Sequence, residues 1–137
     1  MKAVVDTNVV LDVFLAREPF VGASAAIFAL VEQSQIEGLL CATTVTTTEY
    51  LLGQTVSPSG ARQILEKLLT LFEIAPVNRP VLEQALRSRI SDYEDAVLDE
   101  AGYIAGAEAI ITRNGKDFRH ARLKVFDPAQ FLAQYER

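Results

Sequence analysis

MKAVVDTNVVLDVFLA (residues 1–16) combines a short apolar run with an acid, Asp6, directly at its end. The run Ala-Val-Val at 3–5 is typical of a strand buried on both faces, and the pattern that follows predicts a helix over about 8–16. A carboxylate placed after such a strand is partly desolvated and needs a cation or a hydrogen-bond donor beside it. Asp6 is therefore a candidate N-cap for the helix and also the first candidate functional residue.

The alternation of short apolar strands with helices continues along the chain. Such strands are typical of a parallel sheet covered by helices on both faces. The sequence therefore predicts an α/β fold, a three-layer α/β/α sandwich in a single domain over residues 1–137. Pro76 assigns the third strand to an edge or end of the sheet. About five strands are expected, at 3–5, 39–42, 74–77, 109–112 and 124–126.

Composition excludes several classes of chemistry. A single cysteine, Cys41, excludes an intramolecular disulfide and a cysteine-based zinc cluster, and a single histidine, His120, excludes nuclease chemistry by a histidine pair. No window approaches the roughly 20 apolar residues of a membrane span, and no signal-peptide core follows Lys2. We expect a cytoplasmic protein whose chemistry depends on carboxylates, amides and hydroxyls.

The net charge of −5 is unevenly distributed. DYEDAVLDE (residues 92–100) holds five acids and no base, whereas residues 113–124 hold five bases beside His120. The average charge disfavours a nucleic-acid partner, but the basic segment could be either a solvated loop or a phosphate-binding surface.

Polar residues gather at the predicted carboxyl ends of the strands, which is where ligands bind in such sheets. Each also has an ordinary structural explanation: Asp92 has the position of an N-cap, and acids in a first helical turn are favoured by the helix dipole. Asp99 and Glu100 are expected to be solvated, and the threonine-rich stretch 43–48 is expected to precede a helix. The residues at this edge are Asp6, Thr7 and Asn8, Glu49, Asp92, Glu94 and Asp95, and Thr112, Asn114 and Asp117.

Converging carboxylates with no lysine or arginine nearby in local sequence repel one another. At least one pKa then rises unless a divalent cation neutralises them. Oxygen ligands suit Mg²⁺ or Mn²⁺, and a metal held in this way can polarise a phosphodiester and supply a hydroxide. The sequence therefore predicts metal-assisted phosphodiester cleavage.

Four blocks of the sequence, in this order and with this spacing, resemble the PIN domain family, including the VapC-type toxins of bacterial toxin–antitoxin pairs. The blocks are VVDTNVVLD, TTTEYLL, DYEDAVLDEA and AEAIITRNGKDF, and the resemblance runs from Lys2 to about Phe126. It implies an endoribonuclease that depends on Mg²⁺ or Mn²⁺, with RNA as substrate, a small antitoxin as partner, and a homodimer as the common assembly.

The resemblance also implies site residues. The family's first three acids match Asp6, Glu49 and Asp95, which would be catalytic and hold the metal. In many members the block after the fourth strand reads T-x-D, but here it reads Thr112-Arg113-Asn114, so that Asn114 or Asp117 would complete the site. Thr7, Asn8, Thr112, Asn114 and Asp92 would orient carboxylates or water, and Arg113, Lys116 and Arg119 would contact RNA phosphates.

Two other functions stay open at this point. A PIN-like domain without catalysis would bind RNA or a protein and show no metal-dependent turnover. A receiver-like phosphotransfer protein would accept a phosphoryl group on Asp6 or Asp95, although Lys116 is the only nearby strand-end lysine.

Overall fold

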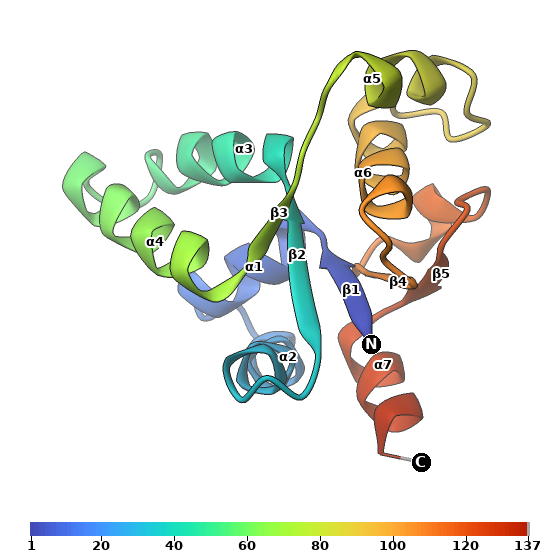
Figure 1. The fold of residues 1–137 in the computed structure, drawn as a ribbon. Coiled ribbons are helices and arrows are strands. Elements are labelled where there is room, and N and C mark those ends of the chain that lie inside the picture. The colour runs from blue at the N-terminus through green and yellow to red at the C-terminus, as the bar shows by residue number, and fades with distance from the viewer. Residues whose placement is uncertain (137) are drawn as a thin grey trace.

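The computed structural model describes residues 1–136 and contains a central sheet of five parallel strands in the order β3-β2-β1-β4-β5 (Figure 1). Val4 in the middle strand pairs with Leu39 on one side and Ile110 on the other. The predicted parallel sheet is confirmed, and β3, which ends directly before Pro76, lies at an edge as predicted. The strands are β1 (Lys2–Val5), β2 (Glu37–Cys41), β3 (Glu73–Ala75), β4 (Ala109–Ile111) and β5 (Lys124–Phe126).

Helices connect the strands within the described residues. Several begin at the polar residues that the sequence indicates as N-caps, because the side-chain oxygen of each cap accepts a backbone N–H of the first turn. No helix of residues 1–136 has both the length and the apolar character needed to cross a membrane. The helices are α1 (Thr7–Phe14), α2 (Val21–Glu32), α3 (Ala42–Leu52), α4 (Pro58–Leu71), α5 (Arg79–Leu86), α6 (Tyr93–Ile104), the 3₁₀ turn η1 (Gly115–Phe118) and α7 (Pro128–Tyr135).

Different helices cover the two faces of the sheet. Val4 and Ile110 lie in one core together with residues of α5 and α6. Val5 and Ile111 lie in the other core, with residues of α1, α2, α4 and α7. Neighbouring residues of a strand point to opposite faces, which explains this division. Figure 1 shows α6 and α2 on opposite sides of the strands, so the predicted three-layer sandwich is confirmed.

Strand order reverses between β1 and β4. The chain passes from β1 outward to β2 and β3, and then returns to place β4 on the other side of β1. The carboxyl ends of β1 and β4 therefore lie side by side at the edge where parallel sheets bind ligands. This edge holds the residues that follow Val5 and Ile111.

Two local expectations were wrong. The threonine-rich stretch 43–48 lies inside α3, which begins directly after β2. The Thr46 hydroxyl donates a hydrogen bond to the carbonyl oxygen of Thr43 within the helix. Asp99 and Glu100 are buried rather than solvated. The Asp99 carboxylate accepts the backbone N–H groups of Arg122 and Leu123, and Arg122 Nε donates to Glu100 Oε1 at 2.9 Å.

Strand β2 approaches its covering helices closely at Gly38. A Cβ atom built on Gly38 would lie 2.7 Å from Cδ1 of Phe72 and 2.8 Å from Cγ2 of Val31. Gly38 is thus required by packing at the centre of the fold.

We expect the Gly38→Ala substitution to lower the free energy of unfolding by about 1–3 kcal/mol, because an added methyl overfills a packed core. Gly22→Ala is a matched control. Gly22 lies on α2 with nothing within 4 Å of its added Cβ, and alanine there should raise stability by up to about 1 kcal/mol. Urea denaturation measures both, and equal stabilities for the two variants would contradict the packing argument.

Candidate active site

Asp6 is fixed at the point where the strand order reverses. Its backbone N–H donates to the carbonyl oxygen of Ile111 in β4 at 2.9 Å. Its carboxylate caps α1 by accepting the Thr7 N–H on Oδ1 at 2.8 Å. The residue is only 8% exposed. Burial raises the pKa of Asp6 above its ordinary value, although its hydrogen bonds oppose this rise.

Two polar side chains hold the second oxygen of Asp6. Thr112 Oγ1 donates to Oδ2 at 2.7 Å, and Asn8 Nδ2 donates to the same oxygen at 3.2 Å. The backbone N–H of Asn114 donates in turn to Thr112 Oγ1 at 3.0 Å. The residues after β1 and β4 therefore form one hydrogen-bonded network that sets the orientation of the Asp6 carboxylate.

Asp95 reaches the same site from α6. Asp92 caps this helix by accepting the Asp95 N–H on Oδ1 at 3.0 Å, which places Asp95 in the first turn. Burial, followed by the charge of Asp6, raises the pKa of Asp95 to about 7, and the charges of Asp92, Asp117 and Glu94 add to this rise. The two carboxylates are thus close enough to repel each other.

A polar cavity of about 350 Å³ lies at this edge. Four acids line it, from the end of β1 and the start of α6, and the lining also holds two arginines and four uncharged polar side chains. The lining residues are Asp6, Thr7, Asn8, Leu11, Arg17, Thr47, Leu51, Asp92, Glu94, Asp95, Arg113 and Asn114. We call this cavity the acidic pocket.

Glu94 is a pocket residue to which the sequence interpretation assigned no specific role. Its Oε1 accepts a hydrogen bond from Thr47 Oγ1 at 3.1 Å, which joins α6 to α3. Its charge contributes to the raised pKa values of both Asp6 and Asp95. Its place beside Asp95 in the DYED run was the available signal, but the partner on α3 could not be read from the sequence.

Two of the predicted metal ligands do not line the acidic pocket. Glu49 is half-buried on α3, and Asp117 is exposed on η1, although its charge reaches Asp95. Within residues 1–136 no three side chains of histidine, cysteine, aspartate or glutamate form a ready metal cage. The ligand roles of Glu49 and Asp117 therefore stay predictions.

The donor set of the pocket nevertheless suits a hard divalent cation. Mg²⁺ commonly takes one or two protein carboxylates and completes its coordination with water and substrate phosphate. Asp6 and Asp95 supply two such carboxylates, and their mutual repulsion is of the kind that a cation relieves.

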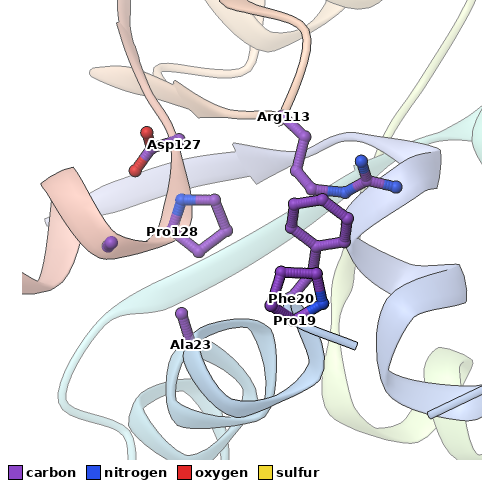
Figure 2. Close-up of a pocket in the computed structure, with 7 residues that line it drawn as sticks. Pro19, Phe20, Ala23, Arg113, Asp127 and Pro128 are labelled. Carbon is purple, nitrogen blue, oxygen red and sulfur yellow. The ribbon is translucent and has the colours of Figure 1, made fainter. Parts of the chain in front are cut away.

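The three predicted phosphate contacts have different environments. Lys116 and Arg119 are exposed and form no ion pair with any residue of 1–136. Arg113 is instead bound to the carboxylate of Asp12, with Nε 2.6 Å from Oδ2. Its guanidinium carbon lies 3.8 Å from the ring centroid of Phe20 (Figure 2). Arg113 is therefore a fixed part of the pocket wall, not a solvated loop residue.

Several solved structures share this fold. VapBC2 from Rickettsia felis, bound to a DNA fragment from the promoter, aligns with a TM-score of 0.74 and 14% identity over 93% of this chain and 98% of that chain. VapC20 from Mycobacterium tuberculosis, a sarcin-ricin loop cleaving toxin, has a TM-score of 0.69 and 16% identity over 84% and 92%. A toxin–antitoxin complex from Klebsiella pneumoniae has a TM-score of 0.69 and 22% identity over 92% and 97%.

These identities support a shared fold, and the family itself rests on a sequence comparison. No curated protein matches the chain significantly. The family model of the PIN domain matches residues 2–116, which include the acidic-pocket residues that follow β1 and begin α6. The chain belongs to the PIN domain family.

Proposed function

We propose that the protein is a metal-dependent endoribonuclease and the toxin of a type II toxin–antitoxin pair. One observation carries the proposal: Asp6 and Asp95, which are 89 positions apart in the sequence, line one pocket at the strand-order reversal, where burial and then the charge of Asp6 raise the pKa of Asp95. Membership in the PIN domain family supports nuclease chemistry, and PIN nucleases generally use a divalent metal.

Asp6 and Asp95 would hold Mg²⁺ or Mn²⁺, which supplies Lewis-acid polarisation of the phosphodiester and a metal-bound water of lowered pKa. The chain's other residues set the geometry of these ligands. Thr112 and Asn8 fix Oδ2 of Asp6, the Thr7 N–H fixes Oδ1, and Asp92 fixes the first turn that carries Asp95. This preorganisation keeps the carboxylates in place before the substrate binds.

The partners follow from the same proposal. We propose RNA as substrate, with Lys116 and Arg119 as exposed phosphate contacts, and a small antitoxin protein as inhibitor. The solved Klebsiella pneumoniae structure, which is a toxin–antitoxin complex, supports the second partner. The homodimer and the cytoplasmic location stay predictions, and light scattering after gel filtration measures the first.

A second candidate function is RNA or protein binding without cleavage. Asn114 in the pocket wall, where many family members have an acid, favours it because an amide adds no negative charge to a metal site. The phosphotransfer alternative has less support, since Lys116 does not line the acidic pocket.

We expect Asp6→Asn and Asp95→Asn each to reduce RNA cleavage in Mg²⁺ by at least about 10²-fold, since a lost ligand removes several kcal/mol of metal-dependent stabilisation. Glu108→Gln is the control, because Glu108 is exposed and directly precedes β4, so it lies at the amino ends of the strands, away from the acidic pocket. Gel electrophoresis of end-labelled RNA measures cleavage. Full activity of the Asp6→Asn/Asp95→Asn double variant would exclude the proposal that the acidic pocket is the site of metal-dependent RNA cleavage.

A crystal soaked in Mn²⁺ tests the metal site without a substrate. We expect anomalous difference density within about 2.1 Å of a carboxylate oxygen of Asp6 and of Asp95. The same map decides whether Glu49 or Asp117 moves in as a further ligand. A well-diffracting soaked crystal with no anomalous peak in the acidic pocket would favour the candidate function of binding without cleavage.

The raised pKa of Asp95 predicts how stability depends on pH when metal is absent. The folded-state value of about 7 exceeds the unfolded value of about 3.9, so between these values the folded state binds more protons and stability falls as pH rises. Asp95→Asn removes this loss. Urea denaturation in EDTA should therefore show the variant gaining stability relative to wild type from about pH 4 to about pH 8. A difference that does not change with pH would contradict the raised pKa.

A further inference from the structure

A second charged cluster adjoins the carboxylates of the acidic pocket. Asp12 on α1 has a side chain that is 0% exposed, and two arginines neutralise it. Arg17 Nε lies 2.9 Å from Oδ1, while Arg113 donates to both oxygens, from Nε at 2.6 Å and from Nη2 at 3.1 Å. A carboxylate buried to this degree persists only when it is paired and hydrogen-bonded.

Further contacts fix the orientation of both guanidinium groups. Arg17 Nη2 donates to the carbonyl oxygen of Asn8 at 3.1 Å. Arg113 lies over the face of Phe20, as Figure 2 shows. Asn8 also donates to Asp6 Oδ2 through its side chain, so the arginine pair is connected to the carboxylate site through one residue. The arginines therefore have a set position relative to Asp6.

Each arginine of the pair keeps one guanidinium nitrogen that donates no hydrogen bond within the described residues. Both arginines line the acidic pocket, and their side chains are 38% and 23% exposed. Within residues 1–136, Nη1 of Arg17 and Nη1 of Arg113 donate to no acceptor. Asp12 brings one negative charge against two positive charges, so the cluster keeps a net positive charge beside four acids.

We propose that Arg17 and Arg113 form a phosphodiester-binding subsite in the wall of the acidic pocket, and that Asp12 is the positioning residue that orients both. This inference rests on the proposed function, because it takes the RNA phosphate as ligand. Guanidinium N–H groups match phosphate oxygens in geometry and charge. A phosphodiester bound there would accept hydrogen bonds from the arginines, in the same pocket as the carboxylates that the proposed function assigns to a divalent cation.

Binding of a fluorescein-labelled ten-nucleotide oligouridylate, measured by anisotropy in EDTA over a salt series, tests the arginines without cleavage. Arg17→Ala should weaken binding about 10-fold or more. It should also reduce the slope of log K against log salt by about 0.7, the value for one lost phosphate contact on a single strand. Arg17→Lys keeps the positive charge but not the planar, bidentate donor geometry of a guanidinium. It should therefore show the wild-type slope but a lower affinity than wild type.

Lys124→Ala is the matched control, because Lys124 is an exposed cation at the start of β5 and therefore lies at the amino ends of the strands, away from the acidic pocket. It should leave affinity and slope close to those of wild type. If Arg17→Ala behaves like Lys124→Ala, or if the wild-type protein does not bind the oligonucleotide, the inference is wrong.

The role of Asp12 is tested by whether Asp12→Asn tightens or weakens RNA binding. If Asp12 were only a neighbouring negative charge, Asp12→Asn would tighten RNA binding by removing a repulsion. If it orients the arginines, the same substitution weakens binding at least a few-fold, although both arginines stay charged. Circular dichroism shows whether this variant is folded at the assay temperature. If it is not, the two Arg17 variants still decide whether the arginines form the phosphate subsite.

The failure of this inference can be told apart from failure of the proposed function. Wild-type RNA cleavage in Mg²⁺ together with unchanged binding by Arg17→Ala overturns the subsite and leaves the nuclease. Weakened binding and a reduced slope in Arg17→Ala, with no wild-type cleavage, supports the subsite on a protein that binds RNA without cutting it.

Discussion

The hydrogen bond from Thr112 Oγ1 to Asp6 Oδ2, 2.7 Å long, joins the carboxyl ends of the two strands between which the strand order reverses. The bond is buried, so a missing partner would leave a polar group without compensation. It can form only if β1 and β4 pair in their observed register, in which Val5 lies beside Ile111. Asp6 thus depends on the pairing of segments separated by more than 100 residues, and the acidic pocket depends on Asp6.

Much of this arrangement could be predicted from the sequence, because its signals are local. Most strands are short apolar runs that end at a capping or turn residue, and Asp6 follows one of these runs directly. The position of Asp95 follows from the N-cap at Asp92 and the apolar stripe of α6. Parallel pairing then brings the two acids to one edge without any further information.

The remainder could not be predicted because it depends on contacts between distant residues. Thr47 meets Glu94, and Asp12 meets Arg113 across 101 residues, with no periodicity that links either pair. Asp99 looks like a solvated helical acid until the turn before β5 delivers two backbone N–H groups to it. Sequence patterns indicate which face a residue occupies, but not which donor arrives there.

Position 114 carries an asparagine rather than an acid, which limits the negative charge in the acidic pocket. Four acids already line the pocket, and burial together with the charges of nearby acids raises the pKa of Asp95. A further carboxylate there would increase the repulsion that a cation must offset. The backbone N–H of residue 114 holds Thr112 whatever its side chain, so the asparagine keeps this support of Asp6 without adding charge.

Asp12 explains how acids and arginines can line one pocket without cancelling each other. Arg17 and Arg113 are long side chains beside Asp6 and Asp95, and free guanidinium groups would pair with those carboxylates and compete with a cation. Asp12 accepts three hydrogen bonds from the two arginines, and the carbonyl oxygen of Asn8 accepts a fourth, from Arg17. Asp12 lies on the first helix, one turn beyond Asn8. The buried carboxylate therefore keeps the positive charges at the wall and leaves the oxygens of Asp6 and Asp95 to the pocket.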